Sequence, residues 1–256
     1  MVKKILSILA WVVTGAALVT LFVVARENYL GKPIQTINVN IDRAGENGFV
    51  KKDAVLADLD SICQRAKIGT VNMMAIEDRM NSQAWIENSS SFVDLGGNLN
   101  VSIKEYNPML RVFDKNGQSA YLTDEGLLLP PSAGFTPYIL IASGNFDLEA
   151  CPLGHRLCDT LDADHNLIGA TKVFEAIGRN EFMRNSIGQI YCNRNSEFEI
   201  VARDIDARIL LGDTTCLDDK LARLEIFMKQ KTGSNEVKEM KIINLKYKNQ
   251  VVCTKR

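Results

Sequence analysis

The chain has 256 residues, of which 46% are hydrophobic and 24% are charged, and its formal net charge is −1. This composition is typical of a globular protein with one or two cored domains. The near-neutral charge and the scattered aromatic residues exclude the basic, aromatic-lined surface of a nucleic-acid-binding protein. The sequence also lacks the common phosphate-loop, dinucleotide, serine-hydrolase and zinc-protease motifs. We therefore predict no enzymatic activity, no catalytic residue and no cofactor.

The N-terminal residues differ from the rest of the chain. Residues 5–25 carry no charge, and a run of about 20 apolar residues is long enough to cross a bilayer as a helix. Lys3 and Lys4 precede this run and favour a cytoplasmic N-terminus. A cleaved signal peptide is the alternative, but the apolar run exceeds the usual length of its hydrophobic region. We predict a cytoplasmic tail at 1–4, a transmembrane helix at 5–25, and the bulk of the chain across the membrane.

After a connector at 26–33, residues 34–107 are predicted to form a small α+β domain. Alternating apolar residues predict strands, and apolar residues at helical spacing predict two helices, the second capped by Asn72. The predicted order is a strand at 34–41, helices at 48–66 and 72–86, and strands at 91–97 and 98–106.

Residues 108–256 are predicted to form a mostly-β domain with flanking helices. Asn116-Gly117 indicates a hairpin turn between two strands. Helices are predicted at 164–180 and at 217–233, where Gly233 can end the second helix. The buried face of the second helix is predicted to consist of Leu217, Leu221, Leu224 and Met228.

The chain finishes on a predicted edge strand at 243–253. Side chains alternate between the two faces of a strand, so the sequence predicts one buried face and one wet face. The buried face is Ile243, Leu245, Tyr247, Val251 and Cys253, and the wet face is Asn244, Lys246, Lys248 and Gln250. Such an edge can accept a partner's strand. The alternative is a plain edge that Lys246 and Lys248 protect from pairing.

Both histidines of the chain lie in one segment with two cysteines, in the order Cys151, His155, Cys158 and His165. These are ligand types that zinc prefers, but their spacing is not a usual zinc pattern. A Cys151–Cys158 disulfide is a second possibility in an oxidising compartment. We favour four independent side chains and predict no metal ion. A membrane-tethered periplasmic hydrolase that uses this segment is the alternative function.

Several short motifs occur in a specific order. They are Trp85-Ile86, then Leu99, Val101, Ile103, Glu105 and Pro108, then Asp124 and Gly126, then Leu211-Gly212 and Lys220-Leu221, and finally "INLKYKNQVV" at 243–252. Together they resemble the FtsQ/DivIB family of bacterial cell-division proteins, in its Bacteroidetes-type form. The resemblance covers nearly the whole chain. It implies that 34–107 is a POTRA domain and that 108–256 is the FtsQ-type β domain.

The resemblance also implies a function. Members are single-pass inner-membrane scaffolds of the division septum, with a cytoplasmic N-terminus and a periplasmic bulk. They recruit the FtsB–FtsL pair and so couple divisome assembly to septal peptidoglycan synthesis, while the POTRA domain contacts other division proteins. A second alternative is a POTRA module of outer-membrane biogenesis.

The implied partner-binding residues lie at the C-terminus, where a strand of the FtsB-like protein pairs with the terminal edge. They are Ile243, Asn244, Leu245, Lys246, Tyr247, Lys248, Gln250, Val251 and Val252. Lys246 and Tyr247 stand where the family has an Arg-Tyr pair. Because lysine lacks the bidentate fork of arginine, a salt bridge made by Lys246 is expected to be looser.

Overall fold

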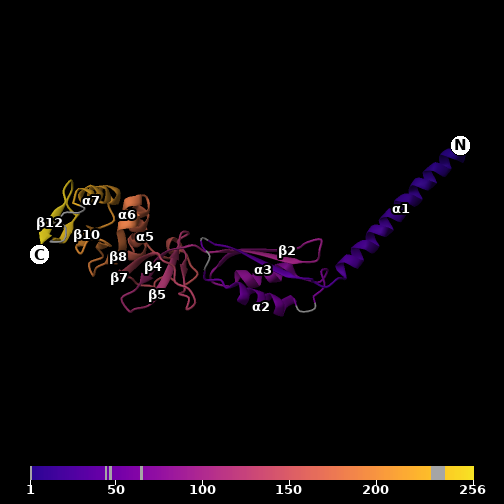
Figure 1. The fold of residues 1–256 in the computed structure, drawn as a ribbon, viewed down its shortest axis with the longest axis horizontal. Helices are drawn as coiled ribbons and strands as arrows, with labels where there is room; N and C mark the ends of the chain where they lie inside the picture. The colour runs from indigo at the N-terminus through magenta and orange to yellow at the C-terminus, as the bar shows by residue number, and fades with distance from the viewer. Residues whose placement is uncertain (1, 44, 46–47, 64–65, 232–239) are drawn as a thin grey trace. The chain divides into compact units, whose positions relative to one another are not determined.

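The computed structural model describes residues 2–43, 45, 48–63, 66–231 and 240–256. The chain forms two compact units, Met1–Tyr106 and Asn107–Arg256. The predicted mixed α+β fold is confirmed, with an N-terminal apolar helix and a large sheet domain (Figure 1).

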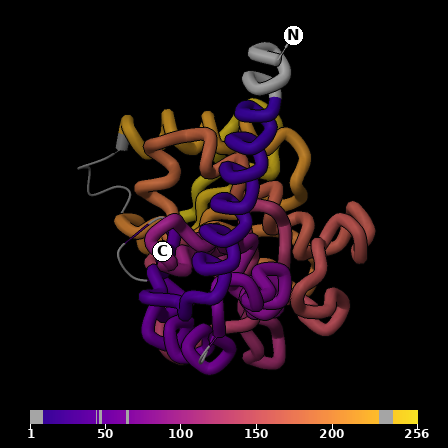
Figure 2. The backbone as a smooth tube through the Cα atoms, turned by 90° about the vertical axis from the view of Figure 1, so that its right-hand side faces the viewer, coloured from indigo at the N-terminus to yellow at the C-terminus, as the bar shows by residue number. Residues whose placement is uncertain are grey.

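The first element is a long helix, α1 (Val2–Leu30), whose coloured part is an uninterrupted coil in Figure 2. Its stretch Leu9–Leu30 is long and apolar enough to cross a membrane, since 22 residues rise about 33 Å. This is consistent with a single-pass membrane anchor. The helix continues past Ala25, so residues 26–30 of the expected connector are helical. Of the predicted tail at 1–4, Met1 lies outside the described residues.

The rest of the first unit follows the order strand, helix, helix, strand, strand. Its elements are β1 (Ile37–Asp42), α2 (Lys52–Cys63), α3 (Met73–Asn81), β2 (Ile86–Val93) and β3 (Leu99–Glu105). The Asn72 side chain caps α3 by accepting a hydrogen bond from the Ala75 N–H at 3.1 Å, as predicted. The strands form one sheet in the order β1-β3-β2, with β1 parallel and β2 antiparallel to β3.

The core of this unit lies on one face of its sheet. Successive side chains of β3 alternate between the buried core and the opposite, open face. The buried side chains include Val55 and Leu59 of α2, Ile76 and Met80 of α3, and Leu99, Val101 and Ile103 of β3.

The second unit contains a nine-stranded sheet in the order β12-β11-β10-β9-β8-β7-β4-β5-β6. Its strands are β4 (Pro108–Phe113), β5 (Ser119–Thr123), β6 (Leu128–Leu129), β7 (Leu140–Gly144), β8 (Ile187–Cys192), β9 (Phe198–Ala202), β10 (Arg208–Gly212), β11 (Met240–Asn244) and β12 (Val252–Lys255). Its helices are α4 (Leu157–Thr160), α5 (Asn166–Gly178), α6 (Glu181–Ser186) and α7 (Leu217–Lys231). The predicted helix end at Gly233 lies outside the described residues.

Two local predictions in this unit are confirmed. The β4–β5 hairpin turns at Asn116-Gly117, where Gly117 has a φ of 83° that glycine adopts without steric cost. The α7 stripe is buried in the core as expected. Its four residues, Leu217, Leu221, Leu224 and Met228, are all at most 7% exposed.

The prediction of one long strand at 243–253 is wrong, because the segment folds back on itself. β11 pairs in parallel with β10 and in antiparallel with β12, and residues 245–251 form the loop between β11 and β12. Asn249 in this loop has a φ of 59°, a left-handed conformation that asparagine tolerates better than most residues.

The pairing register of the hairpin explains why the sequence resembles one long strand. Ile243 pairs with Cys253 and Asn244 pairs with Val252, so paired residues share the same parity. Directly opposed residues of an antiparallel pair point to the same face. The alternation of apolar and polar residues therefore passes through the turn unchanged and resembles that of a single strand.

Candidate partner-binding site at the C-terminal hairpin

The candidate site is the C-terminal hairpin, which we define as residues 240–256. Within the described part of the chain, β12 pairs with β11 alone and is the last strand of the nine-stranded sheet. An edge strand directs about half of its backbone N–H and C=O groups away from its neighbour. The outer side of β12 is therefore the candidate docking edge.

The structure separates the nine predicted contact residues into three groups. Ile243 and Leu245 are fully buried: Ile243 lies in β11 inside the sheet, and the Leu245 N–H donates a hydrogen bond to the Leu210 carbonyl of β10. Asn244 and Val251 are half-buried. The exposed group, which is the part that a partner can reach, consists of Lys246, Tyr247, Lys248, Gln250 and Val252.

Arg223 of α7 holds the hairpin loop in place. Its guanidinium donates hydrogen bonds to the carbonyl oxygens of Tyr247 at 2.7 Å and Gln250 at 2.6 Å. A weaker bond reaches the Leu245 carbonyl at 3.4 Å, and Asp219 pairs with the same guanidinium at 3.0 Å. The Arg223 side chain is only 16% exposed, so α7 fixes the loop from the core side.

The Lys246 side chain extends from the loop toward Glu197, the residue before β9. Its Nζ lies 2.5 Å from the Oε1 of Glu197. The hydrogen bond between these groups raises the pKa of Lys246 and lowers the pKa of Glu197. Lys246 therefore keeps its charge, but that charge is already engaged within the chain.

Gly212 leaves space for the aliphatic part of the Lys246 side chain. A Cβ at this position would lie 2.9 Å from Lys246 Cγ, and the φ of Gly212 is 76°. Both the close approach and the left-handed backbone favour glycine here. The loop that follows is fixed by Lys220, whose Nζ donates to the carbonyl of Asp213 at 2.9 Å and to its carboxylate at 2.8 Å. This bond lowers the pKa of Asp213 to about 2.

The sequence motifs at Leu211-Gly212, Lys220-Leu221 and 243–252 therefore meet in one place, around the base of the hairpin. Arg223 and Glu197 are functional-site residues that the sequence does not predict. The only local signal for Arg223 was its spacing of four residues from Asp219 on one helix face. Nothing in the sequence links Glu197 to a lysine 49 residues away.

The segment with two cysteines and two histidines does not form a shared site. His165 caps α5 by accepting a hydrogen bond from the Leu167 N–H at 3.3 Å. Cys151 is buried, whereas Cys158 is exposed, and neither forms a disulfide. No group of three or more His, Cys, Asp or Glu side chains in the described part of the chain could hold a metal ion.

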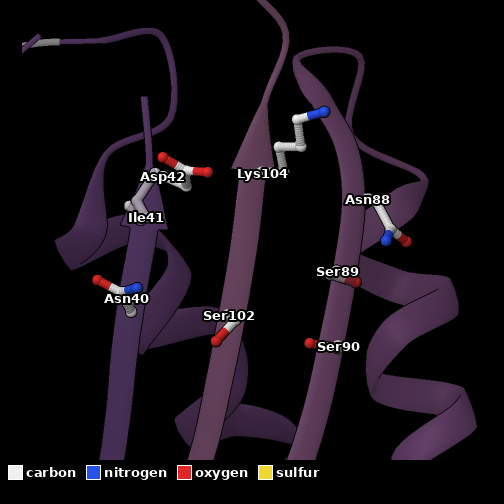
Figure 3. Close-up of a pocket in the computed structure, with 8 residues that line it drawn as sticks. All are labelled: Asn40, Ile41, Asp42, Asn88, Ser89, Ser90, Ser102 and Lys104. Carbon is white, nitrogen blue, oxygen red and sulfur yellow. The ribbon is translucent and has the colours of Figure 1, made fainter. Parts of the chain in front are cut away.

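The open face of the first unit's sheet carries a shallow polar hollow of about 360 Å³ (Figure 3). Its lining comes from all three strands and consists of Asn40, Ile41, Asp42, Asn88, Ser89, Ser90, Ser102 and Lys104. The Lys104 ammonium group lies 2.6 Å from Glu87. Small amides and hydroxyls dominate this hollow, and these groups can form hydrogen bonds with a partner's surface.

The comparison with known families agrees with this geometry. The family described as FtsQ/DivIB, C-terminal related, matches residues 107–254, which covers the second unit including the hairpin. The chain belongs to this FtsQ/DivIB-related family. No curated protein matches the chain.

The FtsQ/DivIB family consists of non-enzymatic division scaffolds, so membership indicates a role in cell division and division proteins as partners. The matched region ends at Thr254, inside β12. Most of the terminal strand β12 therefore belongs to the family domain.

Proposed function

We propose that the protein is a bitopic scaffold of the division machinery that recruits an FtsB–FtsL pair through its C-terminal hairpin. A strand of the FtsB-like partner adds to the outer side of β12, and side chains of the 245–251 loop contact the same partner. Through its partners, the assembly is coupled to septal peptidoglycan synthesis.

One observation carries this proposal. Within the described residues, β12 is one of the two terminal strands of the nine-stranded sheet, and all of it except Lys255 lies inside the region that matches a family of division scaffolds. Proteins usually protect such edges because they invite unwanted pairing. β12 ends on the charged Lys255, and Arg256 follows it, but Val252 at its start is 39% exposed. An edge that retains an exposed apolar residue suits β-strand addition.

Strand addition alone is too weak for stable recruitment. β12 has four residues, so a partner strand forms about four new backbone hydrogen bonds. At about 1 kcal/mol each, they contribute about 4 kcal/mol, whereas micromolar binding requires about 8 kcal/mol. The loop must supply the remainder. Tyr247, which is 52% exposed, is its large aromatic residue, and aromatic side chains of this kind often dominate interface energies.

We further propose the following layout, supported by α1 and by the order of elements in the first unit. Residues 1–4 are a cytoplasmic tail, 5–25 span the inner membrane, and 34–107 form a periplasmic POTRA domain that contacts other division proteins. Residues 108–256 form the FtsQ-type β domain at the division septum. The polar open face of the first unit (Figure 3) offers these other proteins a surface, because its helices cover the opposite face.

A binding experiment tests the function. Full-length protein in lipid nanodiscs is titrated with the soluble part of the FtsB-like protein from the same organism. Four forms are compared: wild type, Lys246→Glu, a truncation after Gln250 that removes β12, and Lys115→Glu. Lys115 is an exposed lysine at the tip of the β4–β5 hairpin and serves as a matched charge control.

The proposal predicts binding by wild type and Lys115→Glu, weaker binding by Lys246→Glu, and none by the truncated form. Circular dichroism must show that every form remains folded. Equal binding by the wild-type and truncated forms would exclude β12 as the docking site.

A further inference from the structure

Leu95 is the most exposed of the large hydrophobic side chains in the described residues, at 96%. It occupies the tip of the loop between β2 and β3. The Asp94 carbonyl accepts a hydrogen bond from the Gly97 N–H at 3.0 Å and so closes a tight turn, with Gly97 at a φ of 86°. Isolated exposed leucines are common on protein surfaces, so the position of Leu95 decides what it can do.

The loop is bonded to the end of the membrane helix. Tyr29, in the last turn of α1, donates a hydrogen bond from its hydroxyl to the Asp94 carbonyl oxygen at 2.7 Å. In Figure 1 the β2–β3 loop lies at the end of the first unit from which α1 departs. Leu95 is the residue next to that carbonyl and therefore lies close to the end of α1.

The connector after α1 is fixed to the same part of the unit by backbone hydrogen bonds. The Gly69 N–H donates to Leu30 and the Ile68 N–H donates to Lys32, both at 2.9 Å. The Gln35 N–H donates to the Gly97 carbonyl in the β2–β3 loop at 3.0 Å. The connector is therefore an ordered part of the first unit, and it holds the loop beside the helix.

These bonds set the depth of Leu95 relative to a bilayer. The uncharged run ends at Ala25, and Tyr29 follows four residues later, about 6 Å further along a helix. The headgroup layer on each side of a bilayer is about 5–8 Å thick. Tyr29, and with it the Asp94 carbonyl, therefore reaches only the headgroup level. Leu95 is next to that carbonyl and 96% exposed, so it lies at the membrane interface when α1 spans the bilayer.

We propose that the β2–β3 loop is a membrane-contact site at which Leu95 inserts into the lipid interface. Lys32 and Lys67, both exposed, belong to the two segments that the Ile68–Lys32 bond joins. Ammonium groups at this level attract the phosphates of anionic lipids. The contact adds a second point of attachment beside α1 and restricts how the first unit can tilt on the membrane. It rests on α1 spanning the membrane, as proposed above.

Tryptophan quenching by brominated lipids tests this contact. The full chain is reconstituted in vesicles of phosphatidylethanolamine and phosphatidylglycerol that contain brominated phosphatidylcholine. The chain has two tryptophans, Trp11 in α1 and Trp85 in the core. The reporter Leu95→Trp is made in a Trp11→Phe background, so that the signal of the buried Trp85 is common to all variants and is subtracted.

The matched control is Asn88→Trp in the same background. Asn88 is exposed on β2, six residues before Asp94, and so lies about 20 Å along the strand from the loop. A third variant adds Tyr29→Phe to Leu95→Trp and removes the hydroxyl that holds the loop. The wild-type chain, in which Trp11 remains, reports separately whether α1 is inserted.

We expect Leu95→Trp to lose emission and shift to the blue with bromine near the headgroup end of the acyl chains, while Asn88→Trp does neither. Tyr29→Phe should reduce the quenching of the Leu95→Trp reporter. If Leu95→Trp and Asn88→Trp are quenched equally while Trp11 is strongly quenched, the contact does not exist although the anchor does. If Trp11 itself is not quenched, α1 does not span the bilayer, and both the anchor and this contact are refuted.

Discussion

Replacing Arg223 by alanine should loosen the C-terminal hairpin while leaving the rest of the second unit folded. The guanidinium makes two short bonds to loop carbonyls, at 2.6 and 2.7 Å. Hydrogen bonds from a charged donor contribute about 1.5–3 kcal/mol each. Water can replace part of this interaction once the side chain is removed, so we expect a net loss on the order of 2 kcal/mol in the local stability of the hairpin.

Amide hydrogen exchange measures this loss directly, because exchange through local opening reports the free energy of that opening. A loss of about 2 kcal/mol corresponds to roughly 30-fold faster exchange. The effect should be concentrated in Val252–Lys255, while the amides of α5 keep their rates. Arg223→Lys should fall between wild type and Arg223→Ala, because lysine keeps the charge but not the fork of donors.

Arg179→Ala is the control for removing an arginine that makes a surface ion pair. Its guanidinium lies 2.7 Å from Asp218, and the two side chains are 56% and 75% exposed. Exposed pairs contribute at most about 1 kcal/mol, so β12 exchange should stay at the wild-type rate. Unchanged exchange of β12 in Arg223→Ala would refute the claim that α7 holds the hairpin.

Two further predictions concern the base of the hairpin. Gly212→Ala should destabilise the second unit by about 1–3 kcal/mol in urea unfolding, because of its φ of 76° and its contact with Lys246. The control is Gly178→Ala, at the end of α5, where no atom lies within 4 Å of the new Cβ. It should be neutral or stabilising by up to about 1 kcal/mol. A Gly178→Ala variant that is less stable than Gly212→Ala would contradict this reasoning. The pKa of Asp213 is lowered to about 2 by Lys220, so its pair stabilises the fold above about pH 4 and is lost as the pH falls toward 2. Urea unfolding of wild type and Asp213→Asn should therefore differ at about pH 5 and converge near pH 2, and the difference should be small because the Asp213 carboxylate is 69% exposed.

The sequence predicted best those elements whose pattern is local. The α7 stripe from Leu217 to Met228 and the Asn72 cap of α3 depend on residues within a few turns of one helix, and both are confirmed. The Asn116-Gly117 turn is equally local and was also located correctly.

The candidate site was predicted less completely because tertiary contacts determine it. Residues 243–253 alternate between the two faces in the same way in one long strand and in this hairpin, because each pair joins two odd-numbered or two even-numbered residues. The alternation therefore cannot distinguish the two structures. What separates them is the loop, and the loop is fixed by Arg223 from a helix more than twenty residues earlier. The alternation correctly predicts that Ile243 and Leu245 are buried, but it does not predict the parallel pairing of β11 with β10 that places β11 inside the sheet.

The central claim is that a partner strand adds to the outer side of β12. Hydrogen exchange of the full-length protein in nanodiscs, with and without the FtsB-like partner, tests it most directly. The partner should slow exchange in residues 246–256, with the largest protection in β12 (Val252–Lys255), the strand to which the partner's strand adds. Binding of the partner with no change of exchange in β12 would contradict the account and would place the docking surface elsewhere on the chain.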